Sequence, residues 1–333
     1  MIRTNRLFIN HLDFLTLKSI IILISVFFLC IQTSFASSVF DFDEEEFTIN
    51  SMWNRVLELP KEKAPKIALV LGGGGARGFS HIGVFNVLQA EQVPVDLVVG
   101  TSIGSIVGAF YCAGMPMSKA EELAKNFTWK SVSDISATSM LSMLFTENLL
   151  SNEKIETFLN ENIGDLRFDQ LQIPMVCVAT DLNTGERVLL RDGSVSFAAR
   201  ASATLPGIFK PVEYRQRYLV DGGLSENVPV NIAKLFDPDI IIAVAVSADI
   251  SKNSTDNVFE TLMQSIYIQG KALDGENLRQ ADIIIRPEVG EISAIDMAGA
   301  YGTIEKGFIA AKKAVKQIKI AIINKTLEKY LIE

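Results

Sequence analysis

Histidine is almost absent from this chain, whose 333 residues include only His11 and His81. His11 lies in an N-terminal segment that we expect to be removed, so the mature protein keeps one imidazole. Any Ser-His-Asp triad then needs His81 as its base. His81 falls one turn into a predicted helix, where a packing or loop-bracing hydrogen bond is the more common role. The base for any nucleophilic serine is therefore expected to be a carboxylate.

Clusters of basic residues are missing as well. Lys and Arg total 31 against 39 Asp and Glu, a formal net charge of −8, and no basic cluster of five or more residues occurs. Proteins bind nucleic acid mainly by neutralising phosphates with Lys and Arg. The composition therefore argues against a nucleic-acid partner.

Cysteine is scarce, and one of the three cysteines, Cys30, lies in the same N-terminal segment. Cys112 falls on a predicted helix and Cys177 in a predicted core strand. An oxidising compartment would permit a disulfide between them, but the sequence does not show that the two side chains are within reach. Two buried free thiols are the expectation.

Only one long apolar run occurs, and it lies near the N-terminus from Ile20 to Ile31. Basic residues up to Lys18 precede it, and Ser34-Phe35-Ala36 follows it. This order is typical of a secretory signal peptide. Residues 1–36 are therefore predicted to be a signal peptide cleaved near Ala36, with a retained N-terminal anchor as the alternative. The mature protein is expected to be periplasmic or secreted and to have no transmembrane domain, because a spanning helix needs about 20 apolar residues.

Residues 37–65 form an acidic, polar lead-in, in which we expect one short helix at 52–59. From residue 66 onwards, apolar strands and helices alternate, which predicts an α/β fold with a mainly parallel sheet flanked by helices. Strands are expected at 66–71, 95–99, 174–180, 187–190, 217–220, 240–246 and 282–286, and helices at 78–90, 103–113, 117–126, 152–162, 228–235, 256–273 and 300–323. Residues 129–150 are interpreted as a packed loop, with a mobile lid near the site as the alternative. The oligomeric state is left open.

Two glycine-centred turns carry most of the functional information. The first is Leu71-Gly72-Gly73-Gly74-Gly75-Ala76-Arg77-Gly78, and the second is Gly100-Thr101-Ser102-Ile103-Gly104. Each stands between a predicted strand and a predicted helix, so both should emerge at the carboxyl edge of a parallel sheet, where ligands bind. The first turn supplies backbone N–H groups, and the second lifts the Ser102 hydroxyl out of a sharp bend. A nucleophile beside an oxyanion hole is the minimum apparatus for acyl transfer.

The first turn also permits another interpretation. The spacing Gly73-x-Gly75-x-x-Gly78 fits the dinucleotide-binding fingerprint, which is a weak signal when it occurs alone. The acidic residue expected at the end of the second strand is missing, and Phe79 stands where a P-loop would have its lysine. A Rossmann-like nucleotide-binding module nevertheless remains the competing hypothesis.

The best candidate for a carboxylate base is Asp221, in Val220-Asp221-Gly222-Gly223 directly after a predicted strand. The glycines would allow a carboxylate to sit at an exposed strand end. An ordinary Asp-Gly hairpin turn is the alternative, since that dipeptide is common in turns.

Taken together, these motifs resemble those of the patatin-like phospholipases. The glycine-rich element matches residues 73–78, the Gly-x-Ser-x-Gly element matches 100–104, and the Asp-Gly-Gly element matches 221–223. The segment Ala201-Ser202-Ala203-Thr204-Leu205-Pro206 and the residues Glu226-Asn227-x-Pro229 also fit. The resemblance implies a patatin-like domain over residues 66–320, which leaves 321–333 as a C-terminal tail, and a three-layer α/β/α arrangement.

The resemblance also implies roles for individual residues. Ser102 would be the nucleophile and Asp221 the base that activates it. The oxyanion site would be formed by Gly73, Gly74, Gly75, Arg77 and Gly78, with Gly100 and Gly104 shaping the serine turn and Gly222 and Gly223 following the aspartate. The implied reaction is hydrolysis of a fatty-acyl lipid ester at a membrane surface, through an acyl-enzyme and without a metal or cofactor. An acyltransferase that uses the same Ser-Asp dyad is a further alternative.

Overall fold

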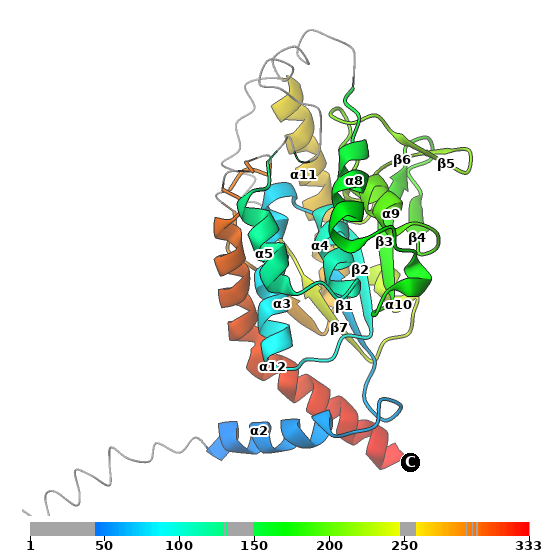
Figure 1. The fold of residues 1–333 in the computed structure, drawn as a ribbon. Coiled ribbons are helices and arrows are strands. Elements are labelled where there is room, and N and C mark those ends of the chain that lie inside the picture. The colour runs from blue at the N-terminus through cyan, green and yellow to red at the C-terminus, as the bar shows by residue number, and fades with distance from the viewer. Residues whose placement is uncertain are drawn as a thin grey trace, which may run out of the picture. The chain divides into compact units, whose positions relative to one another are not determined.

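The computed structural model describes residues 44–128, 131, 149–246, 258–290, 292–294, 296–297 and 299–332 (Figure 1). The predicted signal peptide and nearly all of the predicted loop or lid at 129–150 lie outside these residues. The chain divides into two compact units, Met1–Met52 and Trp53–Glu333, and the second contains the whole sheet. No helix in the described ranges is both long enough and apolar enough to span a bilayer.

The sheet has eight strands in the order β5-β6-β3-β2-β1-β7-β8, and β4 pairs with β3 outside this path. Its parallel centre consists of β1 (Ile67–Leu71), β2 (Leu97–Thr101), β3 (Met175–Asp181), β7 (Ile240–Val244) and β8 (Ile283–Ile285). Every residue of β1, β2, β3 and β7 is buried. Continuous apolar strands are expected in a parallel sheet covered on both faces. The predicted fold class is confirmed.

The other flank of the sheet is antiparallel. β4 (Arg187–Leu190) and β6 (Arg217–Asp221) pair with β3, and β5 (Val212–Tyr214) pairs with β6. The three-residue strand β5 was not predicted, because so short a strand shows no alternation. Asp221, the last residue of β6, is level with Ala179, and the preceding residue on β3 pairs with Thr101 of β2. The reversed direction of β6 therefore delivers Asp221 to the end of β2.

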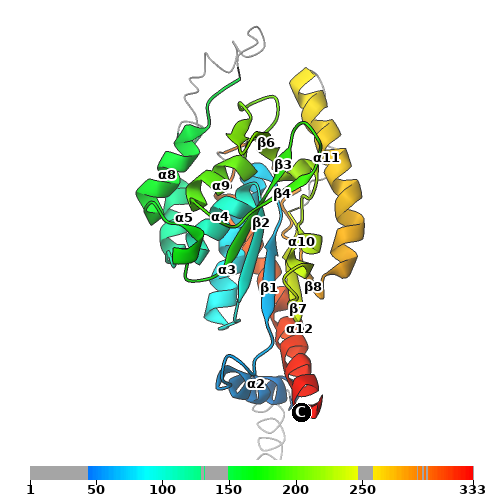
Figure 2. The same cartoon turned by 90° about the vertical axis from the view of Figure 1, so that its right-hand side faces the viewer.

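Helices cover both faces of the sheet (Figure 2). The α-helices are α2 (Glu44–Leu57), α3 (Ser80–Ala90), α4 (Ile103–Cys112), α5 (Met117–Lys125), α8 (Glu153–Ile163), α9 (Val195–Ser202), α10 (Val230–Lys234), α11 (Val258–Asn277) and α12 (Gly302–Ile332). Short 3-10 turns are η1 (Gly75–Phe79), η2 (Phe168–Gln170), η3 (Gly222–Leu224) and η5 (Leu278–Gln280). One sheet face forms a cluster with the side chains of α10. The fully buried helix α4 covers the opposite face, where Gly108 lies against Val98.

The largest boundary differences from the predictions are at α12 and α2. Helix α12 continues to Ile332, with Ile322 and Ile323 buried, so residues 321–332 extend a helix where a separate tail was expected. Helix α2 is longer than the helix predicted at 52–59, and its Trp53 is only 3% exposed. The indole N–H of Trp53 donates to the Glu91 carbonyl oxygen at 3.2 Å. The extension of α12 has an apolar side that is buried only in the folded chain.

Candidate active site

Ser102 lies in a strained bend between β2 and α4. Its φ of 55° and ψ of −128° place a residue with a side chain in a region that costs free energy. The flanking glycines are required by close contacts: a Cβ on Gly100 would lie 2.7 Å from the Gly104 carbonyl oxygen, and one on Gly104 would lie 2.4 Å from that of Leu71. The structure therefore has the predicted nucleophile-elbow geometry.

Ser202, at the end of α9, holds this bend in place. Its hydroxyl accepts hydrogen bonds from the Ser102 amide and the Ser105 hydroxyl, both at 2.9 Å. It donates to the Val178 carbonyl oxygen of β3 at 2.6 Å. Ser202 was noted in the sequence only through the family resemblance, and α9 itself was not predicted. The structure gives this segment a physical role, which is to brace the strained serine.

Ser102 and Asp221 are in direct contact. The Ser102 hydroxyl donates a 2.5 Å hydrogen bond to Oδ2 of Asp221, and the Gly223 amide donates to Oδ1 at 2.8 Å. The two residues are 6% and 5% exposed. Burial raises the pKa of Asp221 to about 6, although both hydrogen bonds act in the opposite direction. A carboxylate that titrates near neutrality suits a general base.

Of the four amides of the glycine loop at residues 72–75, two donate hydrogen bonds to other described residues and two do not. The Gly72 amide donates to the Val244 carbonyl oxygen at 3.0 Å, and the Gly73 amide donates to that of Asn227 at 3.1 Å. Within the described residues, the amides of Gly74 and Gly75 have no acceptor. The expected oxyanion donors are thus narrowed to these two, because the amide of Gly73 is already bound. The same division disfavours the nucleotide-binding alternative, which needs a continuous row of free amides.

Arg77 and Gly78 differ from each other in position. Arg77 lines the cavity beside Ser102, its Nε donates to the Ile292 carbonyl oxygen at 2.6 Å, and its guanidinium lies 5.2 Å from the ring centroid of Tyr267. Burial lowers the pKa of Arg77. Gly78 does not line the cavity, and a Cβ there would lie 2.0 Å from Cγ2 of Ile103. Contrary to the expectation, Gly78 therefore serves close packing of the loop against α4.

His81 is fully buried beneath the loop. Its Nε2 donates to the Gly72 carbonyl oxygen at 2.8 Å, and burial lowers its pKa to about 4, which keeps the ring neutral. The predicted loop-bracing role is confirmed. The triad alternative is disfavoured, because the acceptor of the Ser102 hydroxyl is Asp221. Cys112 and Cys177 are both buried free thiols, as expected.

A cavity of about 420 Å³ opens over the Ser102–Asp221 pair. This volume is within the range of small-molecule sites. The apolar part of its lining consists of Leu205, Pro206, Leu224, Val246, Ile266, Leu278, Ile284 and Ala294. Helix α11 forms one wall, and Tyr267 and Asp274 of this helix were not singled out in the sequence because no motif marks them.

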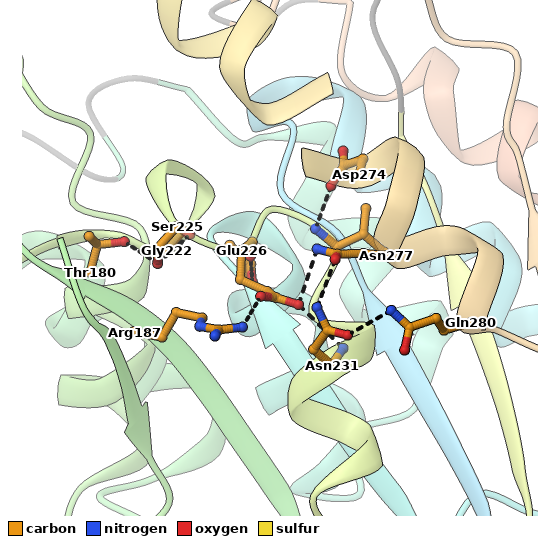
Figure 3. Close-up of polar contacts among 11 residues, drawn as sticks. Thr180, Arg187, Gly222, Ser225, Glu226, Asn231, Asp274, Asn277 and Gln280 are labelled. Carbon is orange, nitrogen blue, oxygen red and sulfur yellow. Dashed lines mark hydrogen bonds and ion pairs between the residues drawn. The ribbon is translucent and has the colours of Figure 1, made fainter. Parts of the chain in front are cut away.

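A buried polar network ties α11 to the loop that follows Asp221 (Figure 3). The Glu226 carboxylate, whose side chain is 2% exposed, accepts from Arg187 at 2.6 Å and from Asn277 at 3.2 Å. Asn227 donates from Nδ2 to Asp274 at 2.8 Å, and its carbonyl oxygen is the acceptor for Gly73. The Glu226-Asn227 pair seen in the sequence thus connects the glycine loop to the cavity wall.

Residues 69–234 match the family model described as Patatin-like phospholipase. The chain is 38% identical over 235 residues to patatin-like phospholipase domain-containing protein 6 of Homo sapiens, covering 68% of this chain and 16% of that protein. It is 32% identical over 191 residues to an uncharacterised NTE family protein of Mycobacterium tuberculosis, covering 57% of this chain and 52% of that protein. The chain therefore spans about half the length of the mycobacterial relative and less of the human one.

Among solved structures, VipD from Legionella pneumophila aligns with a TM-score of 0.46 and 14% sequence identity, over 77% of this chain and 67% of that chain. A likeness at this level bears on neither substrate nor mechanism. The family model and the sequence shared with the relatives show that this chain belongs to the patatin-like phospholipase family.

Proposed function

We propose that this protein hydrolyses fatty-acyl esters of lipids, with Ser102 as the nucleophile and Asp221 as its base. The observation that carries the proposal is the 2.5 Å hydrogen bond between the two side chains at the cavity wall. Gly74 and Gly75 line the same cavity, and their amides have no acceptor in the described part of the chain. A nucleophile, a base and two oxyanion donors thus face one partly apolar space.

In the acylation step, Oγ of Ser102 attacks the ester carbonyl carbon while its proton passes to Oδ2 of Asp221. The negative charge that develops on the carbonyl oxygen is stabilised by the amides of Gly74 and Gly75. The tetrahedral intermediate then loses the alcohol, which takes the proton from Asp221, and the acyl group stays on Ser102. Water reverses these roles: it gives a proton to Asp221, attacks the acyl carbon, and releases the fatty acid as Ser102 regains its proton.

The test combines turnover with covalent trapping. The purified protein is incubated with a monoacyl phospholipid, and released fatty acid is quantified. In parallel, an alkyl fluorophosphonate is added, and the modified peptide is identified by mass spectrometry. We expect modification at Ser102 and loss of both signals in Ser102→Ala. A matched control is Ser265→Ala, which removes a hydroxyl on α11 that binds the Thr261 carbonyl oxygen and does not line the cavity.

Turnover that persists in Ser102→Ala would contradict the assignment of the nucleophile. An absence of both hydrolysis and labelling in the wild-type protein would contradict the proposed function itself. Adding an alcohol acceptor to the same assay reports the acyltransferase alternative, because water and the alcohol compete for one acyl-enzyme.

We also propose that the protein is exported. Support comes from the sequence of residues 1–36, with its basic start, short apolar stretch and Ser34-Phe35-Ala36. Expression of the full chain in a Gram-negative host, followed by fractionation and N-terminal sequencing, is expected to give a periplasmic or secreted protein that begins at Ser37. A membrane-bound protein that keeps Met1 would support the retained anchor.

A further inference from the structure

The charge of the cavity lining is opposite in sign to that of the whole chain. The chain has a formal net charge of −8, yet four cationic side chains line the cavity that contains Ser102. They are Arg77, Lys271, Arg279 and Arg286. Only two acidic residues, Asp221 and Asp274, line it with them. The lining of the cavity around the candidate nucleophile therefore has an excess of positive charge, although the chain as a whole is acidic.

Among the described residues, three of these four cations have no hydrogen-bond, ion-pair or ring partner. Arg77 is bound to Ile292 and stacked over Tyr267. Lys271, Arg279 and Arg286 make no side-chain hydrogen bond, ion pair or ring contact with any described residue. Other basic residues of the same unit do have partners, as the pairs Arg217–Asp181 and Lys319–Glu91 illustrate.

Asp274 interacts electrostatically with Arg286, but both of its oxygens accept hydrogen bonds from other groups. Its Oδ2 accepts from Asn227 at 2.8 Å, and its Oδ1 accepts from the Val228 amide at 3.0 Å. Burial raises the pKa of Asp274, while the charge of Arg286 acts against that rise. The Asp274 carboxylate therefore holds α11 against the loop after Asp221. Lys271, Arg279 and Arg286 remain available to bind an anion.

The strand register places Arg286 within reach of the reacting centre. Ile285 pairs with Val244, and Val244 pairs with Leu71, so Arg286 is level with Gly72 at the carboxyl edge. Two strand spacings separate β8 from β1, so the backbone of Arg286 lies about 10 Å from the glycine loop. Lys271 and Arg279 come from α11 and η5 on the same side. A glycerol ester bound at Ser102 has its phosphate a few bonds away, on the scale of this separation.

We propose that Lys271, Arg279 and Arg286 form a subsite for the anionic headgroup of the lipid substrate. A lipid whose phosphate headgroup carries a net negative charge would then be preferred over a lipid with a zwitterionic headgroup. This inference rests on the proposed function, since it names the substrate class of the same site. Guanidinium and ammonium groups are the usual partners of phosphate oxygens.

The test compares three substrates that share one acyl chain: monoacyl glycerophosphoglycerol, monoacyl glycerophosphocholine and monoacylglycerol. Each is used below its critical micelle concentration, so that surface charge plays no part. We expect kcat/KM to be roughly ten-fold higher for the anionic lipid than for the zwitterionic one, with the difference in KM. Because these cations are exposed and screened, the preference should shrink as NaCl is raised.

Charge removal then localises the effect. Arg286→Gln and Arg279→Gln should each lower the anionic-to-zwitterionic ratio about three-fold, and the triple variant with Lys271→Gln should bring it close to one. The matched control is Lys210→Gln, which removes the same charge from an exposed residue that does not line the cavity. Thermal unfolding checks that each variant folds. If the triple variant does not fold, the two single variants are enough to test the subsite.

The outcomes separate the two proposals. Release of fatty acid from none of the three lipids would overturn the proposed function. Equal kcat/KM for the anionic and zwitterionic lipids, or a preference that survives in the triple variant, would overturn the headgroup subsite alone. Titration of inorganic phosphate into Ser102→Ala distinguishes a free anion from a headgroup. Micromolar binding of phosphate without any lipid preference would overturn the assignment to a headgroup, whereas weak competition with the anionic lipid supports it.

Discussion

Replacing Asp221 by asparagine is expected to abolish ester turnover and, at neutral pH, to stabilise the fold. The substitution keeps the size and shape of the side chain but removes the base. It also removes a charge that is costly to hold, because Asp221 is 5% exposed and burial dominates its pKa. A residue retained for function at a cost in stability is expected to show both effects together.

The magnitude follows from the pKa. Burial raises the pKa of Asp221 from 3.8 to about 6 in the folded protein. A difference of about 2 units corresponds to about 3 kcal/mol, since each unit is worth about 1.4 kcal/mol. The folded state binds the proton more tightly than the unfolded state. The stabilisation from the protonated carboxyl is therefore complete below about pH 4 and is lost as the pH rises through about 6.

The assay is urea unfolding of the wild-type protein and Asp221→Asn at several values between pH 4 and pH 8. Losses from altered hydrogen bonds to Ser102 and Gly223 are present at every pH, so they cancel when the two ends of the series are compared. Between pH 4 and pH 8, the free energy of unfolding of the variant should rise by about 2.4 kcal/mol relative to that of the wild-type protein, which is most of the full effect. A difference that stays constant with pH, or an active Asp221→Asn, would refute the reasoning.

The remaining predictions concern the pH profile, the loop, the histidine and the brace of the serine. In the wild-type protein, kcat/KM for a soluble ester should fall to about one-tenth of its plateau at pH 5, whereas an aspartate of ordinary pKa would keep most of it. Gly75→Ala should lower kcat by roughly 10² to 10³, because φ is +56° and a Cβ would lie 2.2 Å from a carbonyl oxygen; thermal unfolding shows whether the loop alone is affected. His81→Gln should keep most of its kcat/KM and lose about 1 kcal/mol of stability with the bond to Gly72; a well-folded, inactive variant would show that imidazole is the base. Ser202→Ala leaves the buried Ser102 amide unpaired, so stability should fall by about 1–3 kcal/mol in urea unfolding, with a lower kcat and little change in KM.

Features that depend on local backbone geometry were predictable from the sequence. The central strands carry unbroken apolar runs, Gly75 has a φ of +56°, and a Cβ on Gly100 would lie 2.7 Å from the carbonyl oxygen of Gly104. A backbone angle belongs to the residue itself and the contact between Gly100 and Gly104 lies within the turn, so a short motif expresses both. The parallel centre of the sheet, the bend at Ser102 and the loop-bracing His81 follow from this local information.

The short elements and the helix ends could not be predicted in the same way. Strand β5 has three residues, and α9 has eight, with no sustained apolar periodicity. The last turns of α12 are helical because Ile322 and Ile323 are buried against other parts of the chain. In each case tertiary packing outweighs the weak local preference.

The sequence by itself identified the candidate catalytic residues, and only the tertiary structure decided how they meet. Ser102 and Asp221 are 119 residues apart, and their contact depends on β6 running antiparallel to β3. Which glycine amides stay free depends on carbonyl groups of Val244 and Asn227. The cations of α11, of η5 and of the residue that follows β8 share a cavity with Ser102 only because those elements pack at one edge of the sheet. Local sequence encodes backbone angles and apolar periodicity, whereas hydrogen-bond partners and charge neighbours far apart in the chain are set by packing.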